Sequence, residues 1–244
     1  MKCKDKMAIV TGAAGKGMGR SIALTLAREG ARVVVNYRSS EQMAKVVAEH
    51  IVSSGGQAID VQANVFTAEG CKKLVDTAVG EFGQVDICII NPGAEWRPGP
   101  VEQINSAEAL EDVRKELSPW LELMPLLLPG MYQRKWGRLI GLGLSPIGQV
   151  SPGLGYSYCV GKAARAKALL SMAEQAWENR VTVHMIAPGE VPAIESLAEA
   201  IEQCDHGPAW QNRQNVSPQD VAEGVSFLCS EAGRFISSCE LPYQ

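Results

Sequence analysis

The sequence contains few of the features that mark membrane, secreted or nucleic-acid-binding proteins. Its longest apolar run, residues 121–129, is interrupted by Glu122 and two prolines and is therefore a poor transmembrane helix. The N-terminal segment leads into strand-like residues without the apolar core of a signal peptide. Lysine and arginine never form runs longer than two, and 27 acidic against 23 basic residues give a net charge of −4. We therefore expect a soluble cytoplasmic protein that binds neither membranes nor nucleic acid.

Cysteine is too scattered to suggest disulfides or a metal site. The seven cysteines include no Cys-x-x-Cys pair and have no histidine at metal-ligand spacing. We expect reduced thiols and no bound metal. Hydrophobic residues make up 46% of the 244 positions, enough for a large core, and no Pro/Gly/Ser-rich linker divides the chain. Residues 1–244 are therefore predicted to form one domain.

Short apolar segments of β type alternate with longer segments of helical period. This alternation predicts a parallel sheet with crossover helices. The runs at 31–35 and 87–90 are apolar almost throughout, as expected for strands that helices cover on both faces. The sequence therefore predicts a doubly wound α/β fold. Its expected strands are residues 7–10, 32–36, 58–61, 85–91, 138–142 and 181–186.

Two expected helices and one irregular segment complete this outline. Ser217 followed by Pro218 and an acidic residue predicts the start of the last helix. The segment from Ser106 onward has helical period but contains Pro119 and Pro125, so we expect a bent helix there. Residues 192–215 show little periodicity, and we interpret them as a mobile substrate flap.

A glycine-rich turn follows the first expected strand. Residues 11–19 read Thr-Gly-Ala-Ala-Gly-Lys-Gly-Met-Gly and lead into a helix expected at 20–29. Such a turn lets the backbone approach a pyrophosphate at the positive N-terminus of a helix. Glycine-rich turns also occur as ordinary connections, and the strand-turn-helix context is what favours a dinucleotide site.

Tyr158 and Lys162 have the spacing Tyr-x-x-x-Lys, and Ser145 stands thirteen residues before the tyrosine. Asn-Pro-Gly at 91–93, Asn-Val at 64–65 and Ala-Pro-Gly-Glu-Val at 187–191 each follow an expected strand. Together with the glycine-rich turn, this ordered set resembles the short-chain dehydrogenase/reductase family over nearly the whole chain. The resemblance implies a Rossmann-type, doubly wound three-layer sandwich with a mostly parallel seven-stranded sheet. It also implies an NAD(P)-dependent carbonyl reductase, similar to 3-oxoacyl thioester reductases.

The resemblance assigns the catalytic roles. Tyr158 is the general acid/base, Lys162 tunes it and binds the cofactor ribose, and Ser145 stabilises the carbonyl oxygen. Positions 158 and 162 share one face of a helix, and a nearby cation lowers the pKa of a phenol from about 10. Each residue alone could be a packed aromatic, a solvated lysine or a turn serine. Only their joint placement favours catalysis.

The end of the second strand indicates the cofactor. Residues 36–39 read Asn-Tyr-Arg-Ser, with a cation and a hydroxyl where an acid would select NAD. NADP(H) is therefore favoured, with NAD(H) possible. The resemblance assigns the following residues to the cofactor site: Gly12, Gly15, Lys16, Gly17, Met18, Gly19, Tyr37, Arg38, Ser39, Asn64, Val65, Asn91, Pro92, Gly93, Tyr158, Lys162, Pro188, Gly189 and Val191.

Several positions depart from the family pattern. Four residues separate Gly12 from Gly17, one more than usual. Glu116 stands where many members have an asparagine that supports a water relay to the lysine. This carboxylate could order water, point away, or pair with Lys162 or Arg114, because burial of an unpaired charge is costly. Pro192-Ala193 replaces a threonine that commonly binds the cofactor's carboxamide.

The expected substrate pocket combines aromatic surface with few charges. Its candidate walls are Trp96, Pro146, Ile147 and Trp210, and Arg97 is the one obvious cation near the entrance. A medium-sized, partly apolar carbonyl compound would suit it. The resemblance further implies a homodimer or homotetramer, formed through the helix after Ser106 and the helix that carries Tyr158. The alternative function is a nucleotide-binding regulator or scaffold with weakened catalysis.

Overall fold

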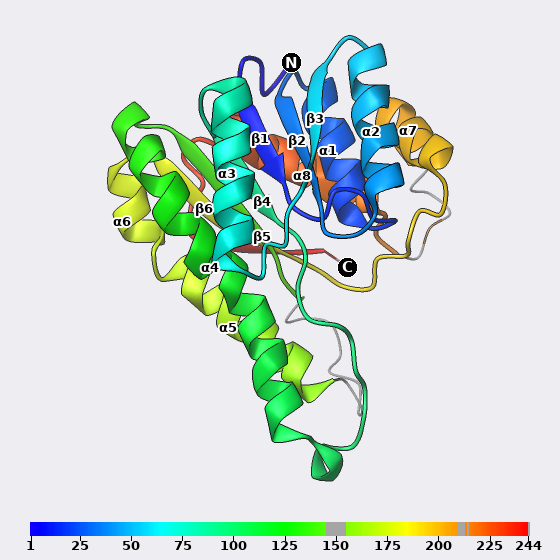
Figure 1. Ribbon diagram of the computed structural model, residues 1–244, viewed down its shortest axis with the longest axis vertical. Helices are drawn as coiled ribbons and strands as arrows, with labels where there is room; N and C mark the ends of the chain where they lie inside the picture. Colours follow the sequence, from blue (N-terminus) through cyan, green and yellow to red (C-terminus); the bar gives the residue numbers. More distant parts are fainter. Residues whose placement is uncertain (145–154, 209–212, 214, 244) are drawn as a thin grey trace.

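A computed structural model describes residues 1–144, 155–208, 213 and 215–243. At its centre lies a sheet of seven strands in the order β3-β2-β1-β4-β5-β6-β7, and every neighbouring pair among these strands is parallel. Figure 1 shows this sheet between two layers of helices. The strands are β1 Met7–Val10, β2 Arg32–Tyr37, β3 Gln57–Gln62, β4 Ile87–Ile90, β5 Gly137–Leu142, β6 Val181–Pro188 and β7 Cys239–Tyr243.

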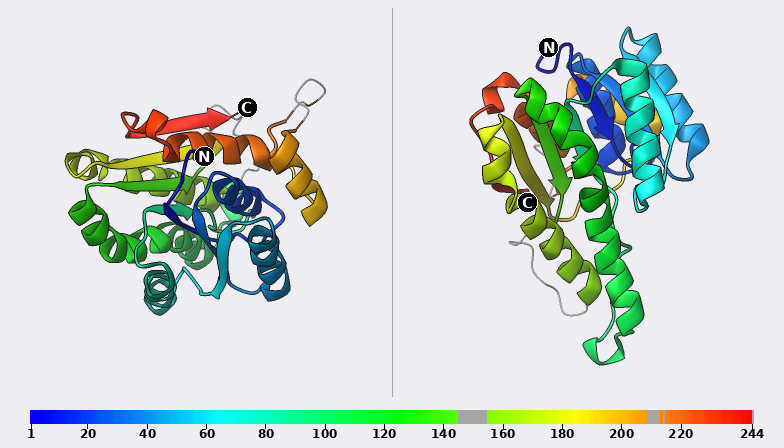
Figure 2. Two further views of the ribbon diagram at one scale, coloured as in Figure 1. Left: turned by 90° about the horizontal axis from the view of Figure 1, so that it is seen from above. Right: turned by 60° about the vertical axis from the view of Figure 1, so that its left-hand side comes forward.

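The helices cover both faces of the sheet, which explains why the central strands are apolar throughout. One core cluster packs beneath α1 Met18–Arg28, α2 Glu41–Ser53, α7 Leu197–His206 and α8 Pro218–Cys229. The other packs beneath α3 Ala68–Phe82, α4 Ser106–Arg134, α5 Tyr156–Leu170 and α6 Ala173–Glu178. The views in Figure 2 show the three layers from two further sides. Two short 3₁₀ helices, η1 Val101–Gln103 and η2 Glu231–Gly233, lie in the connections.

The strand order reverses between β1 and β4, which are direct neighbours in the sheet. Chain segments leaving these two strands therefore diverge toward opposite faces. In an open parallel sheet, this divergence creates a crevice at the carboxyl ends of the strands. The residues that follow β1 and β4 are the glycine-rich turn and Asn91, so the fold brings these two predicted segments together.

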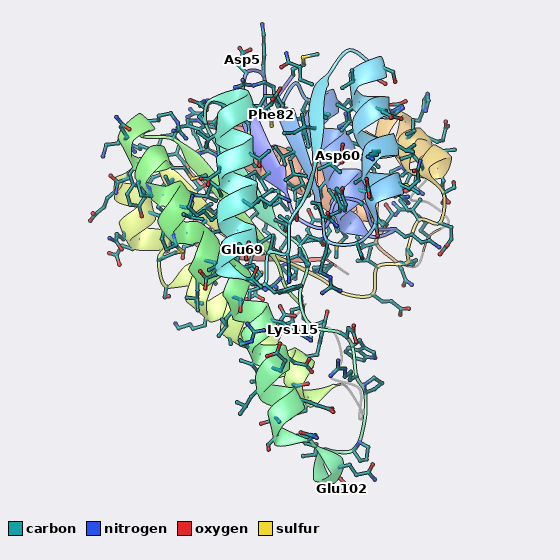
Figure 3. All side chains as sticks on the ribbon, in the orientation of Figure 1. Asp5, Asp60, Glu69, Phe82, Glu102 and Lys115 are labelled. Atoms are coloured by element: carbon teal, nitrogen blue, oxygen red, sulfur yellow. The ribbon has the colours of Figure 1, made fainter. Side chains whose placement is uncertain are left out.

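Helices α4 and α5 pack side by side and extend beyond the sheet (Figure 1). Asn105 caps α4 through its side-chain oxygen, which accepts hydrogen bonds from the backbone N–H groups of Ala107 and Glu108. Glu102, labelled in Figure 3, marks the tip of this projection. The 29-residue helix continues through three prolines, at positions 119, 125 and 129. Each proline leaves one backbone carbonyl of α4 without its usual N–H donor.

The fold class and the last helix predicted from the sequence are confirmed. Ser217 and Asp220 form a reciprocal capping box at the start of α8. The segment interpreted as a flap contains α7, which Ser196 caps and which was not predicted. Strand β7 was likewise not among the strands expected from the sequence. None of the described helices is long and apolar enough to cross a membrane, and the described residues contain no cluster of metal-ligating side chains.

Candidate active site

The glycine-rich turn is fixed by hydrogen bonds to the loop after β4. Thr11 donates its hydroxyl proton to the Ile89 carbonyl at 2.9 Å and accepts from the Asn91 backbone N–H at 3.1 Å. The Asn91 amide in turn donates to the carbonyls of Thr11 and Gly12, both at 3.3 Å. Gly12 has a φ of +62°, a conformation that favours glycine. Asn91, assigned to the cofactor, thus also shapes the turn.

Helix α1 begins close against this turn. A Cβ atom at Gly19 would lie 2.5 Å from the Gly12 carbonyl oxygen, so only glycine permits the approach. Gly17 is the N-cap and offers no side-chain acceptor to the first N–H groups of α1. These N–H groups and the positive end of the helix dipole are the usual partners of a phosphate.

A cavity of about 250 Å³ lies beside the turn. The carbonyls of Val61 and Ala63 fix the Asn36 amide at 3.2 and 3.1 Å, and Asn36 Oδ1 accepts from the Gly12 N–H at 3.3 Å. The structure therefore brings four predicted cofactor segments to one cavity. Its lining residues are Gly12, Ala14, Gly15, Asn36, Tyr37, Arg38, Ser39, Ser40, Ala63, Asn64, Val65, Phe66, Pro92, Gly93, Glu95 and Lys115, the last labelled in Figure 3.

The two cations expected near the phosphates have different surroundings. The Lys16 ammonium is paired with the Glu195 carboxylate, and the Lys16 carbonyl accepts from the Ile194 N–H at 2.8 Å. Arg38 packs over the ring of Phe66, with 5.8 Å between the guanidinium carbon and the ring centroid. Within the described part of the chain, no carboxylate lies within salt-bridge distance of Arg38. Arg38 is therefore the cation that is open to a further anion.

Tyr158 and Lys162 are one turn apart on α5, as their spacing predicted. The Lys162 ammonium nitrogen lies 5.2 Å from the centroid of the Tyr158 ring. The Trp96 ring also packs against the Tyr158 ring in a T-shaped arrangement, with 5.3 Å between centroids and an interplanar angle of 80°. Lys162 is buried, whereas Trp96 is 48% exposed. The couple therefore lies between a buried charged interior and an aromatic surface.

The ionisation of Tyr158 differs from the sequence-based expectation. Burial raises its pKa, the nearby Glu116 carboxylate raises it further, and the Arg165 guanidinium opposes them. We expected Lys162 to lower this pKa. Instead, desolvation disfavours the phenolate in this structure. Burial, reinforced by Arg165, also lowers the pKa of Lys162 to about 8, against the opposing effect of Glu116.

Glu116 lies in the site and pairs with Lys162. Its Oε1 accepts the Ala94 backbone N–H at 2.8 Å and is 3.3 Å from Lys162 Nζ. Its Oε2 lies 2.7 Å from Arg165 Nη2. Arg114, the other partner considered from the sequence, instead forms two contacts of 2.7 Å with Glu111. The possibility that Glu116 points away is thus wrong.

Arg165 was missed by the sequence analysis. Its position three residues after Lys162, on the same face of α5 in an alanine-rich stretch, is a signal that could have indicated it. The guanidinium is fully buried. It donates to three backbone carbonyls: Nε to Glu116 at 3.0 Å, Nη1 to Leu142 at 3.1 Å and Nη2 to Pro92 at 2.6 Å.

The other predicted site residues lie either at the edge of the site or outside the described residues. Pro188 ends β6, and the Gly189 N–H donates to the Tyr243 carbonyl at 3.0 Å, whereas Val191 packs against the core. Gly17 and Met18 lie at the start of α1. Ser145, Pro146, Ile147 and Trp210 fall outside the described residues.

Fold and site together define a nucleotide-binding α/β enzyme of the Rossmann type with a Tyr-Lys couple. The family model described as short chain dehydrogenase matches residues 6–202. The chain belongs to this family, and it is an NAD(P)-dependent short-chain dehydrogenase/reductase.

Named relatives span almost the full length of the chain. The 3-oxoacyl-(acyl-carrier-protein) reductase FabG of Staphylococcus aureus strain Mu50 is 30% identical over 237 residues, covering 95% of this chain and 94% of its own. Versicolorin reductase of Emericella nidulans is 32% identical over 247 residues, covering 95% and 91%. A hydroxysteroid dehydrogenase from Escherichia coli superposes with a TM-score of 0.82 at 27% identity, covering 100% and 97% of the two chains.

Proposed function

We propose that this enzyme uses NADPH to reduce a ketone or aldehyde to an alcohol, with Tyr158 as the proton donor. The observation that carries the proposal is the position of Tyr158 and Lys162 next to the loop that borders the Arg38 cavity. Pro92 and Gly93 line that cavity, and Glu116 joins the same loop to Lys162 through the Ala94 N–H. Two of the relatives reported above are named reductases, which supports carbonyl reduction as the direction of the reaction.

The residues of the cavity fit a phosphorylated dinucleotide. The uncapped N-terminus of α1 suits the pyrophosphate, and Gly12 and Gly15 leave room for it. Arg38 and Ser39 suit the 2′-phosphate that distinguishes NADPH from NADH. When bound, the cofactor supplies the hydride for the reduction.

The cofactor preference is tested by Arg38→Asp. Loss of the cation and gain of a carboxylate should weaken NADPH binding by about 10- to 100-fold while NADH binding changes little. Fluorescence titration of both nucleotides measures this ratio. Lys16→Ala is the matched control, because Glu195 already pairs with that ammonium, and its effect should be clearly smaller. Equal losses for both nucleotides in Arg38→Asp would refute the phosphate-binding role.

The protein groups would act on the substrate oxygen. The raised pKa keeps the Tyr158 hydroxyl protonated at neutral pH, so it can donate its proton to the carbonyl oxygen. The Lys162 ammonium would stabilise the phenolate that results. Ser145 would donate a hydrogen bond to the same oxygen as negative charge develops.

The surroundings of Tyr158 favour a medium-sized substrate with apolar surface. Trp96 presents a half-exposed ring beside the tyrosine. Arg97 lies 3.3 Å from a Glu95 oxygen and 3.7 Å from an Asp112 oxygen. Because two carboxylates already surround this cation, an acidic carrier protein is not part of the proposal.

Turnover decides between the proposed enzyme and a nucleotide-binding regulator. NADPH oxidation, followed at 340 nm with a panel of ketones and aldehydes, should be abolished in Tyr158→Phe while NADPH binding persists. The contact between Lys162 and Glu116 favours the regulator as the second candidate, because that carboxylate competes for the ammonium. NADPH binding without turnover of any carbonyl compound would support it.

We further propose a homodimer or homotetramer formed through α4 and α5. Both helices extend beyond the sheet (Figure 1), and both have exposed apolar side chains. Leu110 and Leu121 of α4 are 71% and 64% exposed, and Val160 of α5 is 40% exposed. Exposed apolar side chains on neighbouring helices are typical of a subunit interface.

A further inference from the structure

A fully buried arginine lies behind the Tyr158–Lys162 couple. Arg165 lies one turn beyond Lys162 on α5, and its guanidinium contacts the carbonyls of three different segments of the chain. These segments are the loop after β4, the end of β5 and the middle of α4. Burial of a cation is costly unless its donors are satisfied. The contacts to Pro92, Leu142 and Glu116 meet that requirement.

We propose that Arg165 is a positioning residue of the active site, which acts through Glu116 to hold Lys162 beside Tyr158. The Glu116 carboxylate lies between the two cations, 3.3 Å from Lys162 Nζ and 2.7 Å from Arg165 Nη2. This inference rests on the proposed function, because it concerns the ionisation of the proposed proton donor.

The position of Glu116 depends on two glycines. A Cβ atom at Gly161 would lie 2.7 Å from Glu116 Cγ, and one at Gly93 would lie 2.2 Å from Glu116 Oε1. Gly161 lies inside α5, where glycine is about 0.5–1 kcal/mol less favourable than alanine. The space that the Glu116 side chain needs explains why a glycine stands at this helical position. We call Gly93, Glu116, Gly161 and Arg165 the carboxylate socket.

The socket places charged side chains where many family members have an asparagine that supports a water relay. The Arg165 Nε–H donates to the Glu116 carbonyl of α4, and its Nη1–H donates to the Leu142 carbonyl, which also accepts from Lys162 Nζ at 3.5 Å. Both Glu116 and Arg165 are fully buried. Lys162 thus faces a charged side-chain cluster.

The charges of the socket act on Tyr158 in opposite directions. The Glu116 carboxylate raises the pKa of Tyr158, and the Arg165 cation lowers it. The neighbouring groups are already paired: Asp112 accepts from the Ser157 hydroxyl at 2.8 Å and lies 3.7 Å from Arg97. Lys115 faces the cofactor cavity. Cys159 follows Tyr158 on α5, and its thiol is neutral near pH 7 because burial raises its pKa.

The test compares Arg165→Met with Glu116→Gln and with the double variant. Arg165→Met should move the ionisation of Tyr158 to higher pH, and Glu116→Gln should move it to lower pH, each by about one pH unit. The double variant should fall between them. Arg114→Met is the matched control, since Arg114 is exposed on α4 and pairs with Glu111. The Arg114→Met variant should leave the ionisation of Tyr158 unchanged.

Two readouts separate this inference from the proposed function. The pH profile of kcat/KM requires turnover, whereas the phenolate absorbance near 295 nm, taken as the difference from Tyr158→Phe, does not. If the wild type turns over no carbonyl compound, the proposed function fails, and the absorbance titration still tests the socket. Shifts of the same sign in Arg165→Met and Glu116→Gln, or no shift in either, would overturn the inference.

Arg165→Lys replaces Arg165→Met if the latter does not fold. Lysine keeps the positive charge but cannot donate to three separated carbonyls in the fixed geometry of a guanidinium. We expect kcat to fall by about tenfold, with KM for NADPH within about twofold of wild type. Wild-type kcat in this variant would refute the positioning role.

Discussion

Alanine at position 161 should damage this protein, although the same substitution stabilises most helices. In an exposed helix interior, replacement of glycine by alanine stabilises by about 0.5–1 kcal/mol. In α5 the new Cβ would lie 2.7 Å from Glu116 Cγ and 3.4 Å from the Val113 Cα atom. Overpacking of this kind costs about 1–3 kcal/mol, which exceeds the gain. We expect a net loss of about 1–2 kcal/mol, or a Tm roughly 2–8 °C lower.

Gly80 provides the matched comparison. It lies within α3, and a Cβ atom there would meet no atom within 4 Å. Gly80→Ala should therefore raise the Tm by about 1–4 °C. Thermal unfolding of both variants, followed by circular dichroism in parallel with NADPH-dependent activity, gives the answer. A Gly161→Ala protein that is as stable and active as Gly80→Ala would refute the carboxylate socket.

The remaining predictions concern pH, assembly and the last helix. The Lys162 cation is present below its pKa of about 8 and is lost above it, so kcat/KM for NADPH should fall as pH rises through about 8. The Lys162→Arg variant should not show that decline, even if its rate is lower, because arginine stays charged over this pH range. Leu121→Glu should yield a smaller species in light scattering without loss of Tm, and an unchanged mass would contradict assembly through α4. Ser217→Ala removes a capping hydrogen bond of 3.2 Å and should cost about 1 kcal/mol, whereas Ser217→Thr should retain stability.

Most of the fold could be predicted because its signals are local. Apolar runs define the central strands, and the Ser217-Pro218 sequence defines the start of α8. Helix α7 was missed although Leu197, Ala200, Ile201 and Cys204 recur at helical spacing, because this pattern is short and lies within a compositionally mixed segment. Strand β7 has no fully buried side chain and contains Pro242, a residue that is unusual within a strand.

The site was predictable only as far as spacing determines contact. Tyr158 and Lys162 share one helix, so their proximity follows from the sequence. The Glu116 contacts join α4, α5 and the loop after β4, segments whose relative positions depend on tertiary packing. The sequence offers both Lys162 and Arg114 as partners of Glu116, and residue spacing does not distinguish between them. The direction of the Tyr158 pKa shift could not be predicted from the sequence either, because it depends on burial.

The carboxylate socket constrains how this active site can change. A glutamate at 116 requires small residues at 93 and 161 and a cation at 165, so substitutions at these four positions should be strongly non-additive. Exchange of Glu116 for asparagine alone would leave Arg165 buried beside a neutral group, and exchange of Arg165 alone would leave a carboxylate with one cation. An engineer who transfers this site to a relative must move the four residues as one unit. We therefore expect single substitutions on the way from this glutamate site to the asparagine site of many relatives to give less stable proteins.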